Sequence, residues 1–155
     1  MIQTEARYSD NSFKTLKRIL LHWTASQTAR SAMDWLDTRL EGKGTVGYNY
    51  IIEKNGMTFR LIPDTSFFHN SGLGKKYDSD TISIAFVSMS EYPTLEQIRA
   101  LVQLITKLQK KFDIFEIRHH AGINNHKQDF PKDYWERLKL NFANIKLARK
   151  NEGEL

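Results

Sequence analysis

Histidines are the residues of this chain best suited to chemistry, and there are five of them: His22, His69, His119, His120 and His126. His22 closes one short apolar run, and the adjacent pair His119-His120 closes another. Sites of open α/β sheets gather at the carboxyl ends of strands, so we expect these side chains to lie near one another. Two imidazoles and one carboxylate, with a fourth position left open, form the ligand set of a catalytic zinc ion. The spacing therefore predicts a metal site that uses His22, one member of the pair and a carboxylate.

Asp129 is the carboxylate that we expect in this set. It lies ten residues after His119, and Lys127 precedes it by two residues. In an extended segment, residues two apart point to the same face, so Lys127 and Asp129 are expected to lie side by side. A cation beside a metal-bound carboxylate is suited to stabilise an oxyanion that develops during a reaction.

Short stretches that are apolar or alternate in polarity predict the strands of the protein. They are residues 18–23, 48–52, 57–62, 82–87 and 115–118. The first and fourth are continuous apolar runs, which are typical of strands buried on both faces. Asn55-Gly56 separates the second from the third, and this dipeptide favours the tight turn of a β-hairpin.

Apolar residues at helical spacing predict helices over residues 28–40, 94–112 and 132–150. The second of these begins with a capping box, in which Thr94 and Gln97 satisfy free N–H groups at the start of the helix. We expect Trp35 to lie in the core on the first helix.

This order of elements predicts an α/β protein with a single mixed central β-sheet of about five to six strands, flanked by helices. No repeat, low-complexity tract or linker rich in Gly, Pro or Ser divides the sequence, so we expect one domain over residues 1–155. Its core is expected to span residues 17–148, with loose ends at residues 1–11 and 150–155.

Composition narrows the class of protein further. With no cysteine among its 155 residues, the chain has no disulfide framework, thiolate metal ligand or cysteine nucleophile. The 23 Lys and Arg against 18 Asp and Glu give a formal net charge of +5, which suits an anionic partner. No apolar run approaches the ~18–20 residues of a membrane span, so no membrane insertion is expected. Residues 1–11 are polar, unlike a secretory signal, so we expect synthesis in the cytoplasm. No sequence pattern indicates an oligomer, so we expect a monomer.

Five segments of the sequence stand in an order that identifies a family. They are a strand ending in histidine within residues 19–26, an aromatic hairpin at residues 46–56, Phe68-His69-Asn70-Ser71-Gly72, Ser83-Ile84-Ala85-Phe86, and His119 followed by Lys127-Gln128-Asp129-Phe130-Pro131. In this order the sequence resembles the zinc N-acetylmuramoyl-L-alanine amidases, a family that includes type-2 amidases, amidase-type phage lysozymes and peptidoglycan recognition proteins. The resemblance implies the mixed-sheet fold of that family.

The resemblance implies a single zinc ion held by His22, His119 and Asp129. The neighbouring His120 stays an alternative to His119, because only spacing distinguishes the two. His126 lies between the candidate ligands and could replace one of them, although the family has no ligand at that place.

The resemblance also implies roles around the metal. Lys127 would stabilise the oxyanion, and Tyr48 would orient the attacking water or the substrate carbonyl. His69 and Asn70 would lie beside the substrate. Many family members carry a glutamate general base where this chain has Val87, so the proton relay is left open: Tyr48 could polarise the water, or Asp129 could take the proton transiently.

The activity that the resemblance implies is hydrolysis of the amide bond between N-acetylmuramic acid and L-alanine in peptidoglycan. The absence of the glutamate and the basic charge favour a phage or prophage endolysin, which would reach the cell wall after release. A cytosolic amidase that recycles wall fragments, or a non-catalytic peptidoglycan-binding protein on the same fold, are the alternatives. A metal-dependent nuclease is disfavoured because it would give His22 no role, so no nucleic-acid partner is expected.

Overall fold

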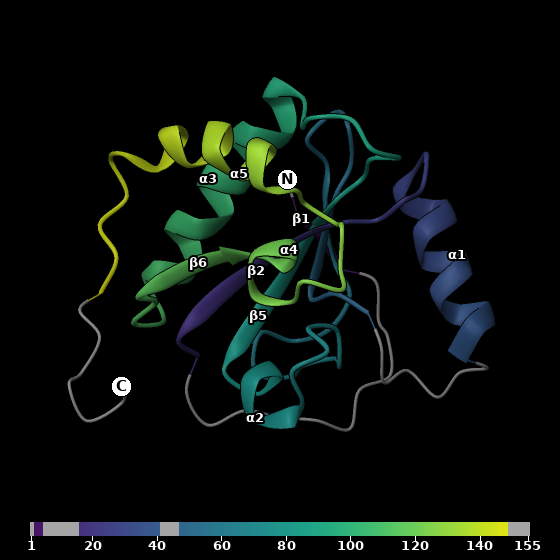
Figure 1. Ribbon diagram of the computed structural model, residues 1–155, viewed down its shortest axis with the longest axis horizontal. Coiled ribbons are helices and arrows are strands. Elements are labelled where there is room, and N and C mark those ends of the chain that lie inside the picture. The colour runs from purple at the N-terminus through teal and green to yellow at the C-terminus, as the bar shows by residue number, and fades with distance from the viewer. Residues whose placement is uncertain (1, 5–15, 41–46, 149–155) are drawn as a thin grey trace.

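The computed structural model describes residues 2–4, 16–40 and 47–148, in which strands and helices alternate (Figure 1). In chain order the elements are β1 (Ile2–Thr4), β2 (Arg18–Trp23), α1 (Ala29–Leu40), β3 (Tyr50–Ile52), β4 (Thr58–Arg60), α2 (Lys75–Asp78), β5 (Thr81–Phe86), α3 (Leu95–Gln109), β6 (Glu116–His119), α4 (His120–Ile123), α5 (Lys132–Leu138) and the 3-10 helix η1 (Lys139–Phe142). None of the helices in these ranges is long and apolar enough to cross a membrane.

The strands form one mixed sheet in the order β1-β4-β3-β5-β2-β6. Strand β2 lies between β5 and β6 and runs parallel to both, so the carboxyl ends of these three strands meet at one edge of the sheet. Within the described residues, only β3 and β4 pair antiparallel, as the predicted hairpin around Asn55-Gly56. The predicted class, a mixed sheet of five to six strands flanked by helices, is confirmed.

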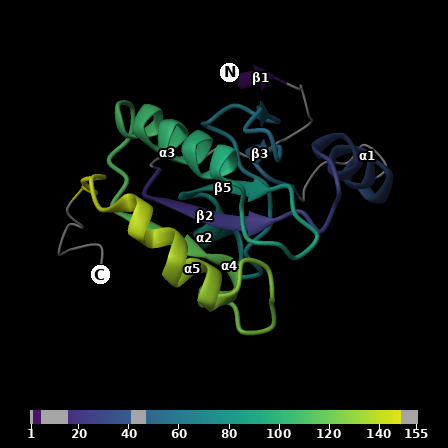
Figure 2. The same ribbon diagram turned by 90° about the horizontal axis from the view of Figure 1, so that it is seen from above.

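Helices cover both faces of the sheet. Figure 2 shows α3 and α5 side by side over one face, and Figure 1 shows α2 below the sheet, on the opposite side. Along β2, successive side chains alternate between the faces. Ile19 and Leu21 belong to the large apolar cluster under α3 and α5. Arg18, Leu20 and His22 therefore point to the opposite face, where the two cavities described below lie.

Helix α3 begins as the sequence predicts. The Thr94 hydroxyl accepts a hydrogen bond from the Gln97 N–H at 3.1 Å, and the Gln97 side-chain oxygen accepts one from the Thr94 N–H at 3.0 Å. This capping box satisfies two backbone donors that would otherwise lack partners. The buried stripe of the helix, which includes Leu101 and Ile105, then packs on the sheet.

The last predicted helix is wrong in length. It was expected to run to residue 150, but α5 ends at Leu138 and η1 ends at Phe142. Phe142 and Ile145 pack against the main core, and the Ala148 N–H donates to the Ile114 carbonyl at 2.8 Å. The chain after Phe142 therefore turns back toward the core as irregular structure, because these contacts replace further helical turns.

The amino-terminal end also differs from the expectation of a loose segment. Residues Ile2–Thr4 form β1, which pairs in parallel with β4, with Gln3 opposite Phe59. A three-residue strand whose partner lies more than fifty residues away leaves no local pattern in the sequence. Residues 5–11 and 150–155, also predicted to be loose, lie outside the described residues.

Candidate active site

Three side chains meet at the carboxyl edge of the sheet: His22, His120 and Asp129. His22 lies near the end of β2, His120 begins α4 directly after β6, and Asp129 lies on the loop before α5. His22 Nδ1 is 2.9 Å from Asp129 Oδ2, and His120 Nδ1 is 2.8 Å from Asp129 Oδ1. One ligand atom from each residue lies within 4.8 Å of the other two, so a single metal ion could contact all three.

The hydrogen bonds of His120 show that the site fits a cation. Its Nε2–H donates to the Ser71 carbonyl at 2.9 Å, and a carbonyl can only accept. In the neutral ring this leaves a lone pair on Nδ1, facing a carboxylate oxygen of Asp129 that is also an acceptor. Two acceptors in contact require a cation, either a proton on Nδ1 or a bound metal. Histidines that bind metals commonly donate their other nitrogen to a backbone carbonyl in this way.

His22 has the protonation state that metal binding requires. Its side chain is buried, and burial is the largest influence on its pKa. Burial outweighs the hydrogen bond and the charge of Asp129, so the pKa of His22 lies below its usual value. The ring is therefore neutral near pH 7, which is the form that coordinates a metal.

Asp129 stays ionised in this group. Burial alone would raise its pKa, but the neighbouring rings of His120 and His22 outweigh burial and hold the pKa well below its usual range. The next residue, Phe130, is buried with φ near +53°, a conformation that costs free energy in any residue with a Cβ. The buried Phe130 ring anchors this bend in the core, directly after Asp129.

The structure places His119 outside the group, which corrects the ligand set that the family resemblance implied. In the pairing of β2 with β6, His119 lies opposite Leu21, so its side chain points to the face that Leu21 shares and away from His22. Its Nδ1–H donates to the Phe130 carbonyl at 2.7 Å, and its ring stacks on Trp135. His119 therefore supports the fold, and His120 takes its place as the candidate ligand.

Two other histidines also lie away from the group. His126 is exposed, and its backbone N–H donates to the side chain of Asn124. His69, predicted to lie beside the substrate, instead places Nδ1 3.6 Å from a carboxylate oxygen of Asp78 and packs edge-on against Phe67. It does not line the cleft next to the metal group.

A cleft of about 320 Å³ opens beside the three candidate ligands. Its lining residues are His22, Trp23, Thr24, Ala25, Trp35, Leu36, Gly47, Tyr48, Asn70, His120, Lys127 and Asp129. Three of the residues that were predicted to lie around the metal thus line this cleft: Lys127, Tyr48 and Asn70. Within the described ranges, the Lys127 ammonium forms no ion pair, so it is available to a ligand.

Tyr48 offers a hydrogen-bond donor to the cleft, and Asn70 offers an acceptor. The Tyr48 ring packs 5.0 Å from the ring of His22. Burial first, and then the charge of Asp129, raise the pKa of the Tyr48 hydroxyl, so it keeps its proton and can donate. Asn70 donates from Nδ2 to the Gly47 carbonyl at 2.8 Å, while its buried Oδ1 has no partner in the described part of the chain and can accept.

Trp35 is a cleft residue that the sequence reasoning placed in the core. Its side chain is 54% exposed and lines the cleft. Four residues of α1 at spacings of i, i+3, i+4 and i+7 are buried and complete the apolar stripe: Ala29, Ala32, Met33 and Leu36. Trp35 lies outside this stripe, and that offset was the signal that could have identified it as a surface aromatic.

Comparison with known proteins identifies the family. The family model described as N-acetylmuramoyl-L-alanine amidase matches residues 12–135, most of the chain. The chain belongs to this amidase family. No curated protein sequence matches it closely enough to count as a relative.

Solved structures of low sequence identity share the fold of this amidase-family chain. The N-acetylmuramoyl-L-alanine amidase LysC from Clostridium intestinale URNW has 19% identity and a TM-score of 0.73, over 94% of this chain and 99% of that one. The endolysin of Thermus scotoductus bacteriophage Ph2119 has 14% identity and a TM-score of 0.65, over 90% and 98%. Drosophila peptidoglycan recognition protein SD has 16% identity and a TM-score of 0.72, over 90% and 93%. The fold therefore serves proteins named as amidases and proteins named as recognition proteins.

Position 87, where many members of the amidase family carry a glutamate general base, is occupied by Val87 in this chain and has no carboxylate. Its side chain is buried in the apolar cluster beneath α1, with Met33 and Ala85 among its members. The backbone of Val87 is also held, since its N–H donates to the Ile52 carbonyl and its carbonyl accepts from Gln97. Position 87 thus contributes packing and no proton acceptor.

Proposed function

We propose that this chain is a zinc-dependent amidase that hydrolyses the bond between N-acetylmuramic acid and the L-alanine of the peptidoglycan stem peptide. The observation that carries the proposal is the meeting of His22, His120 and Asp129 in one cleft with the Lys127 ammonium. Membership of the amidase family supplies the substrate class. When bound, a zinc ion would act as a Lewis acid and lower the pKa of a water molecule toward ~7.

The residues around the candidate ligands have complementary tasks. Attack on an amide carbonyl converts its oxygen into an oxyanion, and the Lys127 ammonium is the cation on the cleft wall that can stabilise it. Tyr48, which keeps its proton, donates a hydrogen bond to the carbonyl or to the water and does not act as a base. The unpartnered Oδ1 of Asn70 can accept an N–H from the stem peptide. Asp129 is ionised and could receive the proton of the water only transiently, because its pKa is held well below its usual range.

The finer role that we propose is that of an endolysin, which acts on the intact cell wall. The net charge of +5 favours binding to a wall polymer that carries many anionic groups. Proteins named as endolysins also share this fold at low identity. A recycling amidase would act instead on small soluble wall fragments.

The test is cleavage of purified peptidoglycan by the zinc-loaded chain. We expect new amino termini of L-alanine without new reducing sugar ends, because an amide and not a glycosidic bond is cut. An endolysin should release them from intact cross-linked sacculi, whereas a recycling enzyme should act only on soluble muropeptides. Zinc binding and peptidoglycan binding without cleavage would show a recognition protein, the alternative that the missing carboxylate at Val87 keeps open.

Trp35 is expected to bind the substrate through its exposed ring. Replacing it by alanine should raise KM by about 3- to 10-fold, because aromatic contacts contribute about 0.5–1.5 kcal/mol beyond buried area. The zinc content and kcat should change by less than about twofold, since the ring contacts none of the reacting atoms in this proposal. Trp35→Phe is the matched control and should keep most of the affinity. An unchanged KM in Trp35→Ala would exclude the ring from substrate binding.

A further inference from the structure

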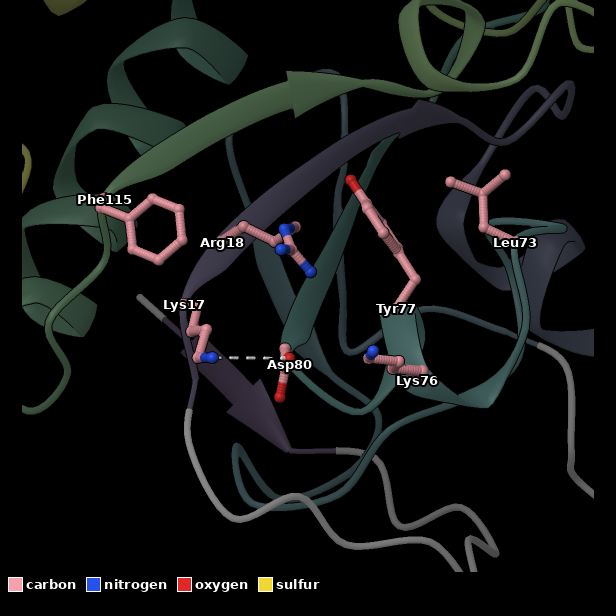
Figure 3. Close-up of a pocket in the computed structure, with 7 residues that line it drawn as sticks. All are labelled: Lys17, Arg18, Leu73, Lys76, Tyr77, Asp80 and Phe115. Atoms are coloured by element: carbon pink, nitrogen blue, oxygen red, sulfur yellow. Dashed lines mark ion pairs between the residues drawn. The ribbon is translucent and has the colours of Figure 1, made fainter. Parts of the chain in front are cut away.

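Figure 3 shows the residues around a second cavity, whose volume is about 310 Å³. The cavity lies on the same face of the sheet as the active-site cleft but at the opposite end of β2. It is lined by Lys17, Arg18, Leu73, Lys76, Tyr77, Asp80 and Phe115. Arg18 begins β2 and His22 lies four residues later, which separates the two sites by about 13 Å along the strand at ~3.3 Å per residue. None of the residues of this cavity lines the active-site cleft.

The walls of this second cavity carry more positive than negative charge. Lys17, Arg18 and Lys76 supply three cations, and Asp80 supplies the one carboxylate among the lining residues. Lys17 Nζ lies 4.0 Å from a carboxylate oxygen of Asp80. Lys76 forms no ion pair with any residue that the structure describes. Lys76 is therefore the ammonium group that this cavity offers to an anion, and Lys17 adds positive charge on the other side of Asp80.

Arg18 holds a fixed position in this cavity. Its Nε–H donates to Glu116 Oε1 at 3.0 Å, which places the guanidinium over the ring of Tyr77 at 4.3 Å from the ring centre. Figure 3 shows Arg18 and Tyr77 facing each other, with Lys17 and Lys76 on either side of Asp80. Arg18 Nη1 also donates to the Thr81 hydroxyl at 3.4 Å. Because Nε is held by Glu116 and Nη1 by Thr81, neither pair of adjacent N–H groups is free to clamp a carboxylate in the bidentate manner.

Tyr77 adds a donor without an acceptor. Its hydroxyl oxygen is buried and has no hydrogen-bond partner within the described ranges. Burial, the largest influence, raises the pKa of this hydroxyl to about 12, so it keeps its proton. A buried donor without an acceptor is costly, and a ligand oxygen that reached this hydroxyl would relieve that cost.

We propose that the second cavity binds the phosphate group of an anionic polymer whose units are joined by phosphodiesters. Lysine ammonium groups act as point charges, which suit a tetrahedral phosphate approached from several sides. Leu73 and Phe115 give the cavity an apolar wall against which the body of a polymer unit can rest. The choice of a wall polymer as the source of the phosphate rests on the proposed function, whereas the preference for phosphate rests on the cavity alone.

Retention of the zinc-loaded chain on insoluble cell walls tests this site. The site variant is Lys17→Gln/Lys76→Gln, and the matched control is Lys75→Gln/Lys110→Gln, which removes the same charge from exposed residues outside the cavity. Walls that carry phosphodiester-linked polymers are compared with the same walls after hydrofluoric acid has removed those polymers. Inorganic phosphate is titrated in parallel, with the amide NMR signals of Arg18 and Tyr77 as the readout.

We expect the site variant to bind phosphate-bearing walls about 10-fold more weakly, and the control to bind within about twofold of the unaltered chain. The difference should vanish on acid-treated walls, and phosphate should shift the two amide signals only when both lysines are present. Equal losses in the two variants would overturn the proposal, because only overall charge would then matter. A difference that persists on acid-treated walls would assign the site to carboxylates and would also overturn it. Phosphate-dependent retention without amide cleavage would refute the proposed function alone.

Discussion

Replacing His120 by glutamine is expected to abolish zinc binding and amidase activity while the chain stays folded. The glutamine amide can still donate to the Ser71 carbonyl, which His120 Nε2 holds at 2.9 Å, but it lacks the Nδ1 lone pair that faces Asp129. Loss of a partner of a metal ligand costs about 10- to 100-fold in metal affinity, so loss of the ligand itself should exceed that. Zinc per chain, thermal unfolding and cleavage of peptidoglycan are the three measurements.

His119→Asn is the matched control for this substitution. Asparagine can replace the Nδ1–H that donates to the Phe130 carbonyl, although the stacking on Trp135 is lost. We expect a lower melting temperature but a zinc content within about twofold of the unaltered chain, since His119 points away from the metal group. The ligand assignment fails if His119→Asn loses the zinc and His120→Gln keeps it.

The contrast between these two neighbours shows where sequence reasoning stops. Alternation predicts that adjacent residues of a strand point to opposite faces, so either His119 or His120 could have faced His22. The choice depends on the register between β2 and β6, in which His119 lies opposite Leu21, and on the end of the strand at His119. Register is a property of the assembled sheet, and neither residue carries a local mark of it.

Local signals, by comparison, predicted most of the elements well. The apolar run at residues 18–23 coincides with β2, and the capping box at Thr94 starts α3 where expected. Both patterns depend only on residues that are close together in the sequence, which is why they can be recognised without the fold. The segment after Phe142 was predicted as part of the last helix, but tertiary contacts of Ile145 and Ala148 override the helical tendency there.

For the candidate site as well, the sequence predicted some features and not others. The candidate residues were recognisable by their types: His22 lies at the end of a predicted strand, Lys127 and Asp129 lie between a predicted strand and a predicted helix, and all three line one cleft. The family motif predicted His69 beside the substrate, but its side chain points toward the carboxylate of Asp78 and not into the cleft. Side-chain direction depends on such partners, which come from elsewhere in the chain and are known only once the chain is folded.

Replacing Lys127 by methionine is expected to lower kcat by about 10²- to 10³-fold, the usual effect of losing one electrostatic donor to an oxyanion. Methionine keeps the length and the apolar stem of lysine, and the exposed Lys127 side chain contributes no ion pair among the described residues, so the fold and the zinc content should not change. KM should move by less than about threefold, because the charge acts on an oxyanion that exists only during the reaction. Lys127→Arg, which restores a cation of different shape, should recover part of the lost rate. A fall in zinc content equal to the fall in rate would instead assign Lys127 to maintaining the metal group, and an unchanged kcat would remove it from the reaction.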